Sequence, residues 1–269
     1  MKTYNGIKPM VLKSLLGILE NPNKTDSDVA RGISLIEENN IGAASLKSLV
    51  GETSKNRAKR IGITGSPGVG KSTLLNTMLI TQDLSMFKVA VIAIDPSSQR
   101  SNGAVLGDRI RMTDGSIFDE IYFRSMATRG SLGGVNKSIQ AVLDFLENCG
   151  FTFIFVETVG VGQNEVEVAN YVDVVVQVID SNSGDSVQME KSGLMEFSDL
   201  FFVNTREGQR FEYFLSSLKD FATSSAKIGG KRPAIVVGSA LSGEVLNEVW
   251  TLLNQAGKNS RDTEGIDQK

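Results

Sequence analysis

The sequence predicts an α/β fold, a doubly wound and mostly parallel β-sheet with an N-terminal helical appendage. From residue 60 onward, short β-branched or aromatic runs alternate with helical stretches, whereas the first 58 residues show helical spacing only. Runs that are apolar nearly throughout are typical of strands covered by helices on both faces. A hydrophobic content of 41% over 269 residues is enough for one large domain with an ordinary core.

The helical appendage is predicted for residues 1–58. Apolar residues recur there at helical spacing in two stretches, which the turn-rich segment NPNKTDSD separates. These positions are Val11, Leu15, Ile18 and Leu19, then Val29, Ile33 and Ile36. Lys13 interrupts the run MVLKSLLGILENP and no small-residue cleavage site follows, so we interpret this run as a helix and not as a signal peptide.

The main domain is predicted to span residues 59–255. Its expected strands are residues 61–64, 89–95, 121–123, 151–157, 172–179, 200–204 and 234–238. The remaining residues, 256–269, form a polar tail without periodicity, which we expect to be disordered.

Composition excludes several classes of function. A formal charge of −3 gives no electrostatic reason to expect nucleic-acid binding. No apolar run approaches the roughly 18 residues of a membrane span, and the single Cys149 cannot form an internal disulfide, so we expect a cytoplasmic protein without membrane partners. The chain contains no histidine, which excludes an imidazole base, a Ser-His-Asp triad and a His-ligated zinc site.

The stretch GITGSPGVGKSTLL contains the pattern G-x-x-x-x-G-K-[S/T] after a predicted strand and before a predicted helix. In that context, glycines let successive backbone N–H groups face a phosphate, and the helix N-terminus adds its positive dipole end. Lys71 can reach the β and γ phosphates, and the Ser72 hydroxyl can ligate Mg²⁺. The alternative is a glycine-rich turn with a surface lysine. The predicted nucleotide-binding residues of this loop are Gly65, Ser66, Pro67, Gly68, Val69, Gly70, Lys71, Ser72 and Thr73.

Carboxylates at strand ends supply the expected metal ligands. Asp95 ends the run VAVIAID and Glu157 ends FTFIFVE, while Asp108 lies in the intervening loop sequence VLGDRIRM. Mg²⁺ takes oxygen ligands, so Ser72 with these three acids forms the predicted metal set. The alternatives are helix-capping carboxylates for Asp95 and Glu157 and a solvated turn for Asp108.

The segment TVGVGQ after Glu157 carries two further candidates for the catalytic set, which otherwise consists of Lys71 and Glu157. The Gly160 amide can meet a γ-phosphate, and such a contact holds a loop in one state until hydrolysis releases it. Gln163 is a candidate for orienting the attacking water, although a glutamine in a polar loop can also be merely solvated.

The extended motifs resemble the MeaB/ArgK family of P-loop GTPases, which are associated with methylmalonyl-CoA mutase and were described earlier as LAO/AO transport system kinases. The resemblance covers residues 10–255 and is carried by GITGSPGVGKST, VIAIDPSSQRSNGAVLGDRIRM, RGSLGGV, FVETVGVGQNE and MEFSDLFFVN. It implies GTP hydrolysis with Mg²⁺. It also implies a chaperone role toward an adenosylcobalamin-dependent acyl-CoA mutase, in which the GTPase gates cofactor loading and protects the mutase.

The resemblance also assigns residues outside the phosphate loop. It places Asp95, Asp108 and Glu157 around Mg²⁺, and it places Lys191, in SGDSVQMEKSG, on a switch surface that communicates with the mutase. An ordinary solvated helix lysine is the alternative for Lys191. In GSALSG, it implies that Ser239, Ala240 and Leu241 flank the guanine.

Two departures from the family pattern stand out. Guanine is read there through N-K-x-D, but this chain has Asn204, Thr205, Arg206 and Glu207, so we expect a weakened guanine preference with Asn204 and Glu207 still in the base site. Family members also continue into a helical arm used for dimerisation, whereas this sequence stops soon after VLNEVWTLLNQ. That difference argues against a homodimer built by that arm.

Three other functions remain as alternatives to the mutase-associated GTPase. A kinase transferring the γ-phosphate to a protein or small molecule usually adds an Arg-rich lid, which we do not find, although Arg100, Arg109 and Arg111 lie in the expected first switch. A nickel-delivery GTPase needs Cys and His ligands, and this chain has one Cys and no His. A degenerate nucleotide-binding module with little turnover is compatible with the altered base-reading motif.

Overall fold

The computed structural model describes residues 7–50, 57–83, 86–95, 121–127, 138–158, 167–180, 194–205, 212–227 and 232–256. Within them, seven strands form one sheet in the order β3-β2-β4-β1-β5-β6-β7. The pairs β2–β3, β1–β5, β5–β6 and β6–β7 are parallel. The predicted α/β class and parallel sheet are therefore confirmed.

The chain divides into two compact units that do not follow chain order. The first unit comprises Met1–Lys59 and Leu84–Phe155, and the second comprises Arg60–Asp83 and Val156–Lys269. The N-terminal helices therefore belong to the same unit as β2 (Val89–Asp95), β3 (Ile121–Ala127) and α6 (Ile139–Asn148).

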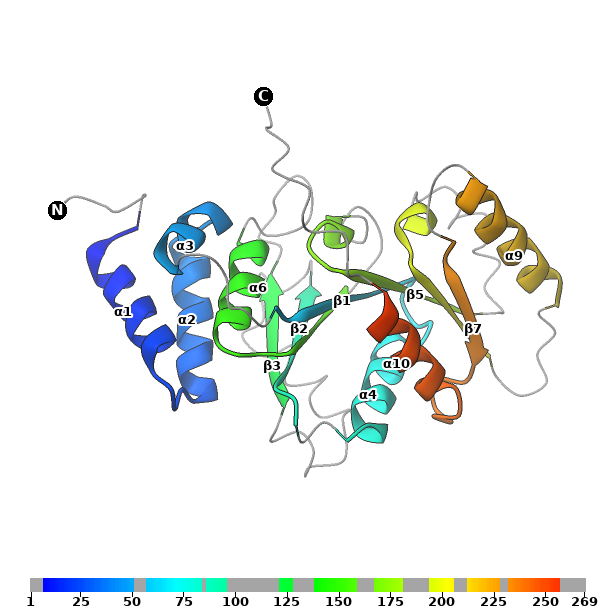
Figure 1. The fold of residues 1–269 in the computed structure, drawn as a ribbon, viewed down its shortest axis with the longest axis horizontal. Coiled ribbons are helices and arrows are strands. Elements are labelled where there is room, and N and C mark those ends of the chain that lie inside the picture. Colours follow the sequence, from blue (N-terminus) through cyan, green and yellow to red (C-terminus); the bar gives the residue numbers. More distant parts are fainter. Residues whose placement is uncertain are drawn as a thin grey trace. The chain divides into compact units, whose positions relative to one another are not determined.

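Three helices begin the first unit: α1 (Pro9–Glu20), α2 (Asp26–Glu38) and α3 (Ala43–Val50). Of these, α2 and α3 pack against α6, and α1 packs against α2 and α3 (Figure 1). Pro9 lies in the first turn of α1, where a backbone N–H has no intrahelical acceptor, so the missing N–H of proline removes no hydrogen bond. Thr25 begins α2 with a capping box, because its hydroxyl accepts the Asp28 N–H and its own N–H donates to the Asp28 carboxylate. The predicted apolar positions Leu15, Ile18, Val29, Ile33 and Ile36 are all buried.

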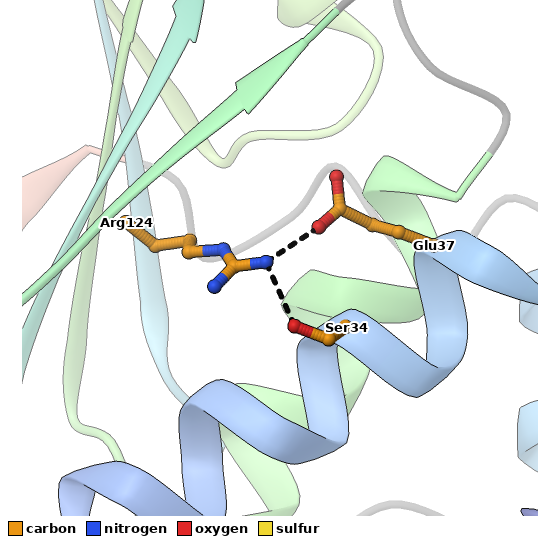
Figure 2. Close-up of polar contacts among 3 residues, drawn as sticks. All are labelled: Ser34, Glu37 and Arg124. Carbon is orange, nitrogen blue, oxygen red and sulfur yellow. Dashed lines mark hydrogen bonds and ion pairs between the residues drawn. The ribbon is translucent and has the colours of Figure 1, made fainter. Parts of the chain in front are cut away.

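Two contacts join α2 to the rest of the first unit. Gly32 lies against the Phe145 ring of α6, where a side chain would not fit. Figure 2 shows the Arg124 guanidinium of β3 pointing to α2, where Nη2 donates to Glu37 Oε2 at 2.9 Å and to Ser34 Oγ at 3.0 Å. Glu37 is buried, so the ion pair satisfies a carboxylate that would otherwise be costly to remove from water.

The second unit contains most of the remaining strands and helices. They are β1 (Lys59–Thr64, from Arg60 onward), α4 (Lys71–Thr81), β5 (Val174–Asp180), η2 (Leu194–Phe197), β6 (Leu200–Asn204), α9 (Glu212–Lys227), β7 (Ala234–Gly238) and α10 (Leu246–Gln255). The strand β4 (Phe153–Thr158) contributes its last residues. Ile179, Phe201, Val203 and Leu218 form a buried core between β5, β6 and α9.

Parallel strands run in the same direction, so their carboxyl ends lie along the same edge of the sheet. This arrangement positions the candidate site. In the second unit β1, β5, β6 and β7 are parallel neighbours, so Thr64, Asp180, Asn204 and Gly238 end their strands at the same edge. The loops that follow β1, β6 and β7 begin there. Ligands of open α/β sheets bind outside this carboxyl edge.

Candidate functional site

The loop between β1 and α4 has the backbone shape that only its glycines allow. Gly65 has φ +132°, and a Cβ there would collide with the Val178 carbonyl oxygen of β5. Gly70 has φ +103° and directly precedes α4, and its Cβ position is 2.5 Å from Asn204 Nδ2. Both residues are therefore held where an L-amino acid side chain is excluded by conformation and by space. We call residues 65–70 the phosphate loop.

Lys71 opens α4 and is buried, with its ammonium turned back onto the phosphate loop. Its Nζ donates to the Gly65 carbonyl at 2.6 Å and to the Ser66 carbonyl at 3.0 Å. These carbonyls partly satisfy a cation that has left water, which would be costly without partners. The lysine thus holds the loop in shape, and its charge lies at the N-terminus of α4, where an anion is favoured.

Ser72 and Glu157 lie together although 85 residues separate them in sequence. The Ser72 hydroxyl donates to Glu157 Oε1 at 2.5 Å. Glu157 is buried near the end of β4, whereas Ser72 is exposed in the first turn of α4. The buried Glu157 carboxylate and the exposed Ser72 hydroxyl therefore place two hard oxygen atoms together at the start of α4, directly after the phosphate loop.

The other predicted acids cannot be placed in the same way. Asp95 ends β2 as expected, but its side chain lies outside the described residues, and Asp108 lies outside them altogether. Among the described residues, no group of three His, Cys, Asp or Glu side chains comes together to hold a metal. The described part of the predicted metal set is therefore the pair Ser72 and Glu157.

Two hydroxyls that the sequence analysis did not single out belong to the residues next to Glu157 and Gly65 in the chain. Thr158 Oγ1 donates to Thr64 Oγ1 at 3.4 Å and lies 3.5 Å from the Ile63 carbonyl, and both threonines are almost fully buried. They tie the end of β4 to the end of β1, next to Glu157 and Gly65 respectively. The sequence signal for these two threonines was a polar residue at the end of an apolar strand. Buried polar groups are normally hydrogen-bonded, so a partner for each could have been expected.

Asn204 joins the phosphate loop to the loop after β7. Its Nδ2 donates to the Val69 carbonyl at 2.8 Å, and its Oδ1 accepts the Ala240 N–H at 2.9 Å. Ser239 Oγ accepts the Leu241 N–H at 3.2 Å, and the Leu241 side chain is 79% exposed. The predicted base-site residues Asn204, Ser239, Ala240 and Leu241 therefore lie together beside the phosphate loop.

Five predicted residues lie outside the described part of the chain: Gly160, Gln163, Glu207, Asp108 and Lys191. Their assigned roles stay predictions. Of the phosphate-loop set, Ser66, Pro67, Gly68, Val69 and Thr73 lie where the motif requires, between β1 and the first turn of α4.

A comparison with models of protein families identifies the family to which this chain belongs. The family model described as methylmalonyl Co-A mutase-associated GTPase MeaB matches residues 29–269. The chain belongs to the MeaB family. It is thus a P-loop GTPase, and the family membership that the motifs predicted is confirmed.

Individual relatives agree with the MeaB assignment. A Pyrococcus horikoshii protein named as a GTPase is 40% identical over 233 residues, which are 86% of this chain and 73% of that protein. The methylmalonic aciduria type A homolog of Caenorhabditis elegans, a mitochondrial protein, is 35% identical over 215 residues, covering 74% of this chain and 53% of that one.

A solved structure supports the fold of this MeaB chain. The structure titled LAO/AO transport system kinase has a TM-score of 0.63 at 24% identity and covers 93% of this chain and 76% of its own. Within the described residues, no helix combines the length and the apolar character needed to cross a membrane.

Proposed function

We propose that this MeaB-family chain is a Mg²⁺-dependent GTP hydrolase that serves an adenosylcobalamin-dependent acyl-CoA mutase of the methylmalonyl-CoA mutase type. In this role it gates the loading of the cofactor onto the mutase and protects the enzyme. The family description, which names a mutase-associated GTPase, supports the partner. The observation that carries the magnesium chemistry is the contact between Ser72 and Glu157.

The donor atoms at this contact fit Mg²⁺. A hydroxyl and a carboxylate are hard oxygen donors, and Mg²⁺ bound to nucleotides usually takes only one or two protein ligands, with phosphates and water completing its shell. Ser72 and Glu157 would hold the ion, with Asp95 and Asp108 as further candidates. When bound, Mg²⁺ would neutralise charge on the phosphates during transfer.

The residues of the chain itself supply the remaining steps of hydrolysis. The amides of the phosphate loop and the α4 N-terminus bind the phosphates, and Lys71 exchanges its loop carbonyls for the phosphate oxygens. Water attacks the γ-phosphate in line, oriented in our proposal by Gln163, while the Gly160 amide senses the γ-phosphate. Because the chain has no histidine, no imidazole base assists, and we expect slow intrinsic turnover that the partner accelerates.

Phosphate release from GTP tests the proposal. The full chain should release free phosphate only with Mg²⁺, and faster when the mutase is added. Glu157→Gln should raise the Mg²⁺ concentration needed for half-maximal release by about tenfold, because the neutral amide is a poorer ligand. Transfer of the phosphate to the mutase would identify a kinase instead, and an unchanged rate with mutase would refute the partner role.

A variant at the expected switch tests the mutase link separately. Lys191→Ala should leave phosphate release by the isolated chain unchanged, because the residue is assigned to the partner surface and not to the nucleotide site. The acceleration by mutase should fall at least fivefold if this lysine contributes a charged hydrogen bond at the interface. Full acceleration in the variant would remove Lys191 from the partner surface.

A further inference from the structure

The hydroxyl pair of Thr64 and Thr158 connects the two parts of the candidate magnesium and phosphate site. Thr64 ends β1 and is followed by Gly65, the first residue of the phosphate loop. Thr158 ends β4 and is preceded by Glu157, whose carboxylate accepts the Ser72 hydroxyl. The Thr158 hydroxyl donates to Thr64 Oγ1 at 3.4 Å, so this hydrogen bond joins the residue after the metal carboxylate to the residue before the phosphate loop.

The position of Thr158 in β4 relates its hydroxyl to the direction of the Glu157 carboxylate. Successive side chains of a strand point to opposite faces of the sheet. The carboxylate that reaches Ser72 and the hydroxyl that reaches Thr64 therefore lie on opposite faces of β4. A bond from Thr158 to β1 resists rotation of the strand end about its own axis. Because the two side chains rotate together, this bond also holds the Glu157 carboxylate toward α4.

Packing alone does not explain why both positions are threonine. Each of the two side chains is only 1% exposed, and the strands that they end are otherwise largely apolar. Valine has nearly the shape of threonine and suits a buried strand, and it carries no hydroxyl that must be removed from water. The hydroxyls are therefore accounted for by their hydrogen bond, in which Thr158 also lies 3.5 Å from the Ile63 carbonyl.

We infer that Thr64 and Thr158 are positioning residues for GTP hydrolysis, because their hydroxyl pair holds the Glu157 carboxylate in place for Mg²⁺. The inference rests on the proposed magnesium site and goes beyond it by assigning two residues that act through Glu157. The two threonines touch neither the ion nor the nucleotide in this assignment. Their contribution is to align the end of β4 with the start of the phosphate loop before the ion binds.

Mg²⁺ titrations of phosphate release by the full chain, at saturating GTP, test this assignment. Thr158→Val removes the hydroxyl and keeps the shape of the side chain. It should raise the Mg²⁺ concentration for half-maximal release about three- to tenfold, the factor that corresponds to one lost hydrogen bond. The KM for GTP at saturating Mg²⁺ should be unchanged, because the bound ion then holds the carboxylate. Thr158→Ser keeps the hydroxyl and should restore the wild-type Mg²⁺ dependence.

Thr64→Val removes the acceptor of the same hydrogen bond and provides a second test. It should shift the Mg²⁺ dependence in the same direction by at least about twofold, and it decides the question if Thr158→Val does not fold. Combining the two substitutions should give no larger shift than Thr158→Val alone, because both remove one interaction. Thermal melting establishes which variants are folded.

A second buried hydroxyl of the same unit supplies the matched control. Ser198 Oγ donates to Gln177 Oε1 at 2.8 Å, both side chains are buried, and neither residue adjoins Glu157 or the phosphate loop in the chain. Ser198→Ala should lower the melting temperature and leave the Mg²⁺ dependence unchanged. A role of the threonines in stability alone would give this same result for Thr158→Val.

Two results would overturn the inference and leave the magnesium site intact. One is an unshifted Mg²⁺ dependence in the folded valine variants. The other is a shift in Thr158→Ser as large as that in Thr158→Val, since the hydroxyl would then not be responsible. Phosphate release by the wild-type chain that does not depend on Mg²⁺ would instead overturn the proposed magnesium site, and this inference with it.

Discussion

At the scale of single residues, Gly65 determines the shape of the phosphate loop. It has φ +132°, and an added Cβ would collide with the Val178 carbonyl oxygen, which belongs to the sheet and cannot move aside cheaply. We expect Gly65→Ala to lower the free energy of unfolding by about 2–4 kcal/mol and to abolish mant-GDP binding. Urea denaturation and nucleotide titration measure the two effects.

Gly68 provides the matched control for this prediction. It also has a positive φ, +79°, but no atom lies within 4 Å of its Cβ position beyond its chain neighbours. Gly68→Ala should therefore cost only the conformational strain, about 1 kcal/mol. Equal losses in the two variants would show that conformation alone, and not the contact with Val178, makes Gly65 necessary.

Lys71 should be needed for nucleotide binding more than for folding. Its Nζ donates to the Gly65 and Ser66 carbonyls, so Lys71→Ala removes contacts from the loop as well as the charge that meets the phosphates. We expect at least a hundredfold weaker mant-GDP binding, because a charged hydrogen bond to phosphate is lost in a partly buried site. An unchanged circular dichroism spectrum would establish that the fold survives, and unchanged affinity would contradict the assignment.

The sequence predicted part of the candidate site because some of its chemistry is local. The spacing from Gly65 to Ser72 lies within one loop and one helix turn, and the strand-end position of Glu157 follows from its apolar run. The bridge from Asn204 to Val69 spans 135 residues, and no spacing rule in sequence encodes it. The threonine pair at the ends of β1 and β4 was missed for the same reason.

At the scale of elements, the packing of α2 on α6 depends on Gly32. A Cβ there would lie 2.7 Å from Phe145 Cε1 and closer still to the ring tip. In a free helix, Gly→Ala is stabilising by about 1 kcal/mol, but here the added methyl overpacks the interface. We therefore expect Gly32→Ala to lower the melting temperature by about 2–8 °C, which corresponds to a net loss near 1–2 kcal/mol for a chain of this size.

Gly17 in α1 gives the opposite expectation and serves as the control. Beyond its own helix backbone and chain neighbours, no atom lies within 4 Å of its Cβ position, so Gly17→Ala should gain most of the helix propensity and raise the melting temperature. Gly32→Ala combined with Phe145→Leu should recover part of the loss by making room. Stabilisation by Gly32→Ala alone would contradict the overpacked interface.

Strand boundaries were predicted correctly where the strand is a continuous apolar run. The runs at residues 89–95, 200–204 and 234–238 coincide with β2, β6 and β7, because an apolar run closed by a turn signal defines both ends. The run at residues 121–123 was too short, since β3 continues through the polar Arg124 and Ser125. Arg124 extends the strand because its charge is paired with Glu37, a contact that strand propensity does not report.

At the scale of the whole molecule, the stability of the fold should decrease at alkaline pH through Cys149. This thiol is buried at the end of α6, and burial raises its pKa from 9.0 to about 11. The folded state therefore disfavours the thiolate, while the unfolded chain ionises freely. The resulting stability is fully present below pH 9 and is lost as the pH rises toward 11.

Lys88 and Tyr122 titrate over a similar pH range, so the experiment needs a control that separates their effects from that of Cys149. Burial lowers the pKa of Lys88, which acts in the opposite direction, and raises the pKa of Tyr122 to about 12, which extends the loss to higher pH. Comparison with Cys149→Ala cancels the burial contribution of both groups and leaves the thiol with its charge interactions as the difference. Between pH 8.5 and 11, the wild-type chain should lose about 2 kcal/mol more than the variant in urea denaturation. Parallel pH profiles would show that the thiol is not shielded in the folded state.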